Sequence, residues 1–100
     1  MPNVASITVD IHDMLYQRII RAAYLEAASA IVKFPQPNYV SLKVAEEAGE
    51  IVKAAVHYAE GREQWIEVET EAVQTIAMIL RLLYEGDQIN GIIPPHLKGE

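Results

Sequence analysis

Apolar residues recur at intervals of three and four along most of the chain, which is the spacing of an amphipathic helix. The first such pattern predicts a helix over about residues 10–33, with apolar positions at Ile11, Met14, Leu15, Ile19, Ala22 and Ala23. Upstream, Ile7 and Val9 alternate with polar residues, which is a weak strand signal. A lone short strand has nothing to pair with, so we interpret residues 1–9 as a lead-in to the helix.

Two more helices follow a proline-containing loop. Pro35 and Pro37 cannot lie inside a helix, so residues 34–39 are expected to form a loop. An apolar stripe then predicts a second helix over about residues 41–60, made by Val44, Ala48, Ile51, Ala55 and Tyr58. Ser41 is a plausible N-cap and Gly61 can end this helix. A third helix is expected over about 62–85 before Gly86, followed by an irregular tail at 87–100.

The pattern therefore predicts one all-α domain over residues 1–100. Hydrophobic residues make up 51% of the chain, which is high for a small soluble monomer. A chain of this length buries a modest fraction of its surface, and three helices do not close a four-helix bundle. We expect a helical hairpin or bundle that is completed by oligomerisation.

Composition excludes several classes of function. The net charge of −6 argues against a protein that binds nucleic acid, because phosphate backbones require clustered Lys and Arg. The absence of cysteine excludes disulfides and thiolate zinc sites. No apolar run approaches the roughly 20 residues that span a bilayer, and no signal peptide is recognisable. We therefore expect a cytoplasmic protein without a membrane partner.

Three carboxylates lie close together in the second predicted helix, at Glu46, Glu47 and Glu50. Glu47 and Glu50 share a helical face, and Lys43 lies one turn earlier on it. Like charges on a largely apolar helix are destabilising unless a cation offsets them, and Mg²⁺ prefers carboxylate oxygens. The alternative is a solvated surface face. Within the same stretch, Gly49 indicates either a close helix contact or room for an ion or a phosphate next to Glu50.

The third predicted helix carries a polar row of its own. Glu71, Gln74 and Arg81 share one face of an otherwise apolar segment, and such residues require partners. Gln74 is equally well interpreted as a hydrogen-bonded core amide. Some of the glutamates before Glu71 complement the helix dipole and face water. The three histidines show no ligand spacing, so we assign them no chemistry.

These residues together resemble a known family. Lys-x-x-Glu-Glu-x-x-Glu over residues 43–50, followed by Glu71-Ala72-Val73-Gln74, is similar to the MazG-like all-α nucleoside triphosphate pyrophosphohydrolases in their small single-domain form. The similarity covers about residues 38–83. The second family motif usually reads Glu-x-x-Asp. Here Gln74 stands in the Asp position, where it keeps a carbonyl oxygen but brings no charge.

The resemblance implies hydrolysis of an NTP or dNTP to the monophosphate and pyrophosphate, in nucleotide-pool house-cleaning, by a homodimer or homotetramer. It implies a Mg²⁺ site, with Mn²⁺ as the other candidate ion, whose ligands are Glu47, Glu50, Glu71 and Gln74. It implies catalytic roles for Glu46, Glu47 and Glu50, with Glu46 orienting water or accepting its proton, or else facing solvent. Substrate contacts are expected from Lys43 and Arg81 to phosphate, and from Asn38 and Trp65, with Phe34 and Tyr39, to the base. The alternative function is a catalytically degenerate helical oligomer that binds a nucleotide or a protein.

Overall fold

The computed structural model describes the backbone of residues 4–99 and the side chains of residues 13–99, and this part of the chain is helical. It contains three α-helices and one short 3-10 helix: α1 (Val4–Lys33), α2 (Val40–Ala59), α3 (Trp65–Glu85) and η1 (Pro95–Leu97). The described residues form no strand, only an isolated bridge between Asp87 and Ile92. The predicted all-α class is confirmed.

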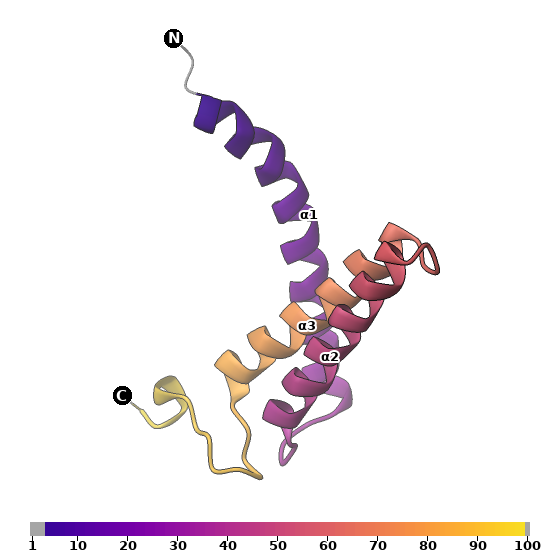
Figure 1. Cartoon of the computed structure of the whole chain (residues 1–100). Helices are drawn as coiled ribbons and strands as arrows, with labels where there is room; N and C mark the ends of the chain where they lie inside the picture. The colour runs from indigo at the N-terminus through magenta and orange to yellow at the C-terminus, as the bar shows by residue number, and fades with distance from the viewer. Residues whose placement is uncertain (1–3, 100) are drawn as a thin grey trace.

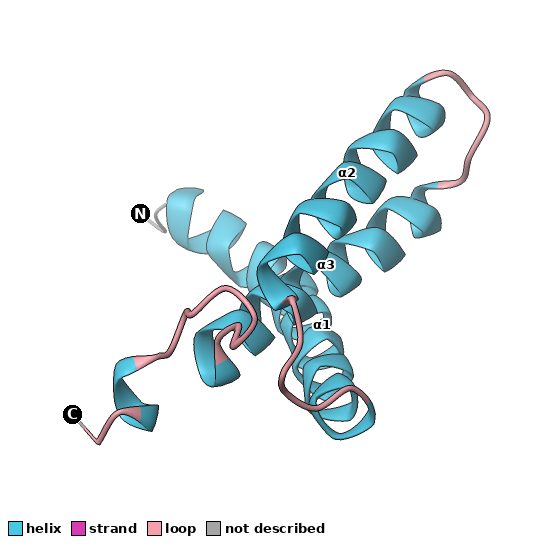
Figure 2. Cartoon of the chain, turned by 90° about the horizontal axis from the view of Figure 1, so that it is seen from below, coloured by secondary structure: helices cyan, strands magenta, loops and turns pink. Residues whose placement is uncertain are grey.

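Helix α3 is the element on which the other two pack. Helices α2 and α3 lie side by side as a hairpin, and the C-terminal half of α1 crosses α3, while its N-terminal half extends away from the pair (Figure 1, Figure 2). The buried core where α1 meets α3 consists of Ala23, Ala27, Ala30, Ala77 and Met78. Because alanine carries little side-chain bulk, the two helices approach closely at this crossing.

The helix boundaries differ from the predicted ones at three points. Helix α1 begins at Val4 rather than near residue 10, because no Gly or Pro interrupts the chain between them. Helix α3 begins at Trp65 rather than near residue 62, because Gln64 is extended, with φ −87° and ψ 155°. Tyr39, not Ser41, is the N-cap of α2, and its side chain makes no capping hydrogen bond. Capping of α2 instead comes from a distant part of the chain.

That distant cap depends on the turn that follows α3. Gly86 has φ +74°, and a Cβ atom at this position would lie 2.1 Å from the carbonyl oxygen of Ile92. The chain then folds back, and Asp87 and Ile92 exchange backbone hydrogen bonds of 2.8 and 2.9 Å. Only glycine permits this turn, which places Asp87 against the start of α2.

A single copy of the chain has an open shape. Its radius of gyration is 16.4 Å, against about 13 Å for a compact domain of 100 residues. Many large apolar side chains remain more than 40% exposed, including Met14, Tyr24 and Leu83. Among the described residues, no helix combines the length and the apolar character that crossing a bilayer requires.

Candidate functional site

The predicted acidic residues of α2 and α3 come together where the two helices touch. The hydroxyl of Thr75 lies 3.1 Å from the backbone carbonyl oxygen of Glu47 and 2.8 Å from that of Glu71. This shared contact fixes the position of α2 along α3. It also places Glu47, which is half-buried, beside the acidic row of α3.

The electrostatics show that these carboxylates interact. Burial raises the pKa of Glu47 above its ordinary value of 4.5, and the negative charges of Glu71, Glu46 and Glu50 raise it further. Lys43 opposes the shift and does not cancel it. Negative charge therefore gathers at the contact between α2 and α3 without full compensation, which is the condition under which a cation binds favourably.

A cavity of about 120 Å³ lies beside these acids, near the turn that joins α2 to α3. Its lining includes two predicted metal ligands, Glu50 and Glu71, and five other residues: Lys53, Ala54, His57, Glu63 and Glu67. Some of the glutamates before Glu71 were predicted to face water; Glu63 and Glu67 are exposed, and both also line this cavity.

A periodic signal for those residues is present in the sequence. Lys53 and His57 follow Glu50 at intervals of three and four, and Glu63 and Glu67 precede Glu71 at intervals of four. Two such stripes on antiparallel helices face each other across the contact. The spacing of the histidines gave no reason to single one out, but His57 lines this cavity.

The donor set suits a hard divalent ion, although the described residues do not enclose one. In residues 13–99, no three His, Asp or Glu side chains converge closely enough to hold a metal ion. Mg²⁺ does not require such a cage, because it keeps several waters and binds through one or two carboxylates plus substrate phosphates. Of the predicted ligands, Glu50 and Glu71 line the cavity, and Glu47 does not. Gln74 is half-buried one turn further along α3.

Gly49, next to Glu50, is exposed, and nothing lies within 4 Å of the position that its Cβ would occupy. Within one chain it is therefore not a close helix contact. The space beside Glu50 is open.

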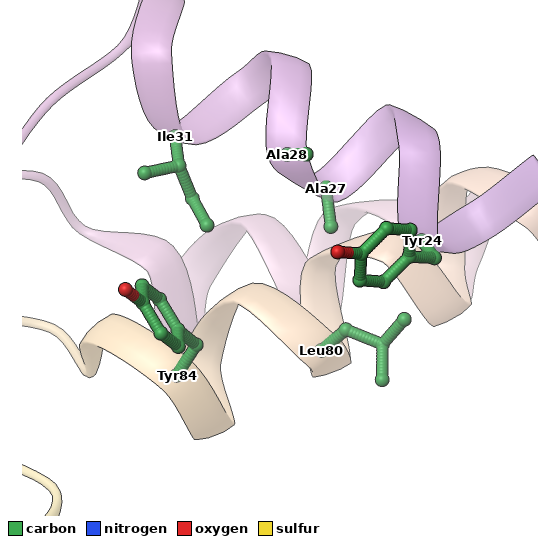
Figure 3. Close-up of a pocket in the computed structure, with 6 residues that line it drawn as sticks. All are labelled: Tyr24, Ala27, Ala28, Ile31, Leu80 and Tyr84. Carbon is green, nitrogen blue, oxygen red and sulfur yellow. The ribbon is translucent and has the colours of Figure 1, made fainter. Parts of the chain in front are cut away.

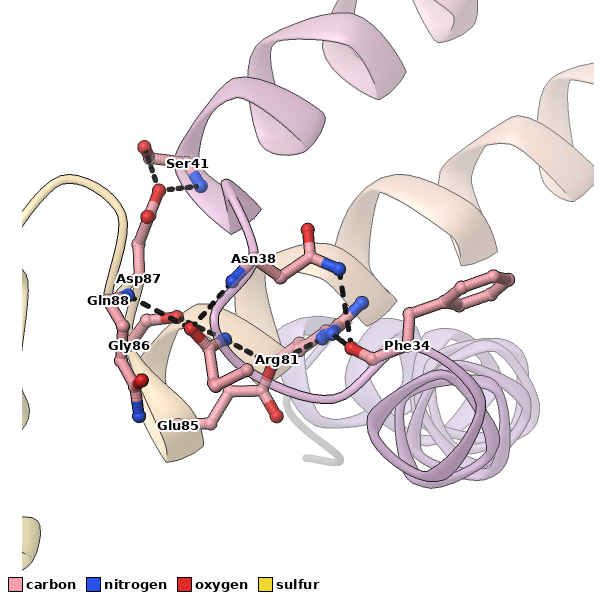
Figure 4. Close-up of polar contacts among 9 residues, drawn as sticks. Phe34, Asn38, Ser41, Arg81, Glu85, Gly86, Asp87 and Gln88 are labelled. Atoms are coloured by element: carbon pink, nitrogen blue, oxygen red, sulfur yellow. Dashed lines mark hydrogen bonds and ion pairs between the residues drawn. The ribbon is translucent and has the colours of Figure 1, made fainter.

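Arg81 lies in a different environment from the one predicted. Its side chain is 1% exposed, its Nε donates to Glu85 Oε1 at 2.6 Å, and its Nη2 donates to the backbone carbonyl of Phe34 (Figure 4). It also lies ten residues beyond Glu71, or about 15 Å along the helix. Arg81 is thus a buried ion-pair residue and does not face a phosphate site at the acids.

Around Arg81, a hydrogen-bond network joins the α1–α2 loop to the end of α3. Gln36 Nε2 donates to Glu85 Oε1 at 2.7 Å, and Gln36 Oε1 accepts from the backbone N–H of Asn38 and of Gln88. The polar side chains at the end of α3, Arg81 and Glu85, therefore have their partners within the chain.

Asp87 is the capping residue that sequence analysis missed. Its Oδ2 accepts hydrogen bonds from the backbone N–H and the hydroxyl of Ser41, at 2.9 and 2.5 Å (Figure 4). Asn90 Nδ2 also donates to Asp87 Oδ2. Burial acts to raise the pKa of Asp87, but the hydrogen bonds from Ser41 and Asn90 prevail and lower it to about 2. An ionised carboxylate therefore sits at the positive end of α2.

The other predicted substrate residues lie at two separate places. Lys43 Nζ lies 5.6 Å from the ring centre of Tyr39 and 6.0 Å from that of Phe34. Asn38 donates to the carbonyl of Phe34, and its Oδ1 is buried without a hydrogen-bond partner among the described residues. Lys43 in the first turns of α2 and the three residues of the preceding loop thus lie together at the start of this helix.

Trp65 stands at the opposite end of α2. It is half-exposed and packs edge-on against Tyr58, with ring centres 5.1 Å apart. Asn38 precedes α2 and Trp65 follows it, so the 20 residues of the helix separate them by about 30 Å. The two residues predicted to contact the base do not meet within one chain.

Comparison of the chain with protein-family models, curated proteins and solved structures gave no match.

Proposed function

We propose that this protein hydrolyses nucleoside triphosphates, NTP or dNTP, to the monophosphate and pyrophosphate with Mg²⁺ or Mn²⁺. The observation that supports this most is the uncompensated charge where α2 touches α3. There, burial and three neighbouring carboxylates raise the pKa of Glu47. Holding like charges together is destabilising, and a bound cation removes this repulsion, which favours its binding.

In this proposal, the carboxylates of Glu47, Glu50 and Glu71 hold the ion, and the Gln74 carbonyl oxygen adds a neutral donor. When bound, a divalent ion neutralises phosphate charge and lowers the pKa of an attacking water molecule. Glu46 is exposed beside the cluster, where it is available to orient that water and accept its proton.

The substrate contacts are proposed at the loop end of α2. Lys43 lies one turn before Glu47 and carries the positive charge available to a phosphate there. Phe34 and Tyr39 supply aromatic surface to a base, and the Oδ1 of Asn38 is a buried acceptor that an amino group of a base can satisfy. Trp65 contributes to these substrate contacts only if another copy supplies it.

Pyrophosphate release from a panel of NTPs and dNTPs, with and without Mg²⁺, tests the proposal. We expect metal-dependent release by the unaltered chain and none by Glu50→Gln. The matched control is Glu60→Gln at the end of α2, where the carboxylate pairs with Arg62 at 3.1 Å and lies outside the acidic cavity. If Glu50→Gln and Glu60→Gln released pyrophosphate at the same rate, Glu50 would have no role in the reaction.

The same assay tests a second function. It is suggested because Gln74 stands where the similar family has an Asp, and because no group of described side chains converges on a metal. In it, the protein is a catalytically degenerate helical oligomer that binds a nucleotide or a protein. The discriminating result is tight nucleotide binding with no turnover of any substrate in the panel.

We also propose that the fold is that of the all-α NTP pyrophosphatases, completed by pairing of copies. The open shape of one chain and its exposed apolar side chains support this part of the proposal. The cytoplasmic location stays a prediction.

A further inference from the structure

The turn that follows α3 contains the dipeptide Asn90-Gly91, and both residues are exposed to water. Of the three asparagines in the sequence, Asn90 is the one that glycine follows. Asparagine is a chemically labile residue, and a glycine after it has no side chain to keep its backbone nitrogen away from the asparagine side chain. The sequence and the exposure therefore single out Asn90 as a position for deamidation.

Deamidation needs only water in addition to these two residues. The backbone nitrogen of Gly91 attacks Cγ of Asn90, and the new N–Cγ bond closes a succinimide ring. The bond from Cγ to Nδ2 breaks, and Nδ2 leaves as ammonia with the proton that the Gly91 nitrogen gives up. A water molecule then opens the ring at either of its carbonyl carbons, which leaves aspartate or isoaspartate at residue 90.

The nitrogen that leaves belongs to the cap of α2. Asn90 Nδ2 donates to Asp87 Oδ2 at 2.9 Å and to Ser41 Oγ at 3.3 Å. The same Oδ2 atom accepts from the backbone N–H and the hydroxyl of Ser41 (Figure 4). Loss of Nδ2 therefore removes a donor from the carboxylate that holds the first turn of α2.

The product also brings a negative charge to the cap. Burial acts to raise the pKa of Asp87, but hydrogen bonds from Ser41 and Asn90 lower it to about 2, so Asp87 is ionised at neutral pH. After deamidation an oxygen stands in place of Nδ2, and two carboxylates meet across the distance that a hydrogen bond now spans. Like charges this close repel each other, so Asp87 is expected to move away from Ser41.

The closed turn slows the reaction. The backbone N–H of Gly91 donates to the carbonyl of Gln88 at 3.2 Å, and Asn90 Nδ2 is held by its two acceptors. The attack requires the Gly91 nitrogen and the Asn90 side chain to leave these partners, so the reaction proceeds when the turn opens. Afterwards the turn cannot close with the same hydrogen bonds, and the loss of the cap is permanent.

The end of the tail is held at a different place. His96 Nε2 lies 2.6 Å from the backbone carbonyl oxygen of Tyr84. The ring of Tyr84 lines a groove of about 470 Å³ between α1 and α3, together with side chains such as Tyr24 and Leu80 (Figure 3). Because the side chain of Asn90 bonds to Asp87 and Ser41 instead, its conversion is expected to weaken the start of α2 and to leave the packing of α1 on α3 unchanged.

We propose that Asn90 is a site of spontaneous deamidation, and that its conversion to an acid releases Asp87 from the start of α2. The proposal depends on the turn and the helix start alone. It therefore holds whether or not the protein hydrolyses nucleotides.

Peptide mapping by mass spectrometry tests the reaction on the full chain, incubated at mildly alkaline pH. We expect residue 90 to become a mixture of aspartate and isoaspartate, with release of ammonia. The matched control within the chain is Asn38, which the bulky Tyr39 follows, and it is expected to stay intact. Asp87→Ala removes an acceptor of the Asn90 amide and is expected to speed the conversion. An intact Asn90, or conversion no faster than that of Asn38, would overturn the proposal.

The variant Asn90→Asp tests the consequence, because it places the same charge beside Asp87 from the outset. We expect a lower melting temperature than that of the parent chain, with faster amide hydrogen exchange at residues 41–44 and unchanged exchange at residues 74–80 of α3. Incubation is expected to lower the melting temperature of the parent toward that of Asn90→Asp. Asn90→Gln keeps an amide and is expected to show no such decline. If Asn90→Asp melted and exchanged like the parent, Asn90 would have no part in the cap.

Discussion

Replacing Arg81 with methionine distinguishes a structural guanidinium from a phosphate-binding one. In the fold, Arg81 is 1% exposed and donates to Glu85 and to the backbone carbonyl of Phe34. Its removal leaves the carboxylate of Glu85, whose side chain is 9% exposed, buried with only Gln36 as a donor. Breaking a buried ion pair in this way costs about 3–5 kcal/mol.

That cost is large for a chain of this size, whose total stability is expected to be about 5–15 kcal/mol. At about 4–8 °C per kcal/mol, Arg81→Met is expected to lower the melting temperature by at least about 12 °C. Thermal and urea unfolding, followed by circular dichroism, measure the loss directly.

The double variant Arg81→Met with Glu85→Met provides the control. Because it leaves no unpaired charge, we expect it to recover most of the stability lost in the single variant. A phosphate-binding Arg81 predicts the opposite pattern, in which the single variant melts like the parent chain but has a higher KM for nucleotide. That pattern would refute the structural assignment.

Two further predictions concern Glu47 on α2 and Asp87, the carboxylate that caps the start of α2. Glu47→Gln removes a charge that its neighbours repel, so we expect the free energy of unfolding of the metal-free protein to rise by a few tenths of a kcal/mol. The same variant is expected to show no rise in melting temperature when Mg²⁺ and a dNTP are added. The pKa of Glu47 in the folded chain is raised above 4.5, so protonated Glu47 stabilises the fold at low pH, and this stabilisation is lost as the pH rises through the folded pKa. The Glu47→Gln variant does not titrate at this position, so its unfolding free energy is expected to lack this pH dependence. Parallel curves of unfolding free energy against pH would contradict the reasoning. For Asp87 the sign is reversed, because its pKa is lowered from 3.8 to about 2, so the stabilisation is present above pH 3.8 and is lost as the pH falls toward 2. Asp87→Asn should be less stable at pH 7 and lose less on acidification, and an unchanged acid limb in urea unfolding would count against the cap.

The sequence predicts the helices well because their signals are local. Pro35 and Pro37 exclude helix, apolar spacing sets the faces, and Gly86 ends α3 where expected. The predicted start of α1, near residue 10, was wrong because no residue between Val4 and Asp10 gives a strong signal for starting or stopping a helix.

Contacts between distant residues leave no such local signal. Asp87 caps α2 from a position 46 residues beyond Ser41, and no spacing rule connects the two. The sequence pattern predicts a phosphate contact for Arg81, because a polar residue on an apolar helix has the same pattern whether it binds phosphate or a buried carboxylate. Trp65 and Asn38 flank one helix in sequence, and only its length shows that they stand far apart.

The glycine after α3 gives the tail an influence on the helix that carries the acids. Any side chain at Gly86 would push against the Ile92 carbonyl, and the backbone pair between Ile92 and Asp87 would open. Asp87 would then withdraw from Ser41, and the first turn of α2 would fray. A substitution at residue 86 would thus change the positions of Lys43 and Glu47, because the turn at Gly86 holds Asp87 and Asp87 holds the first turn of α2.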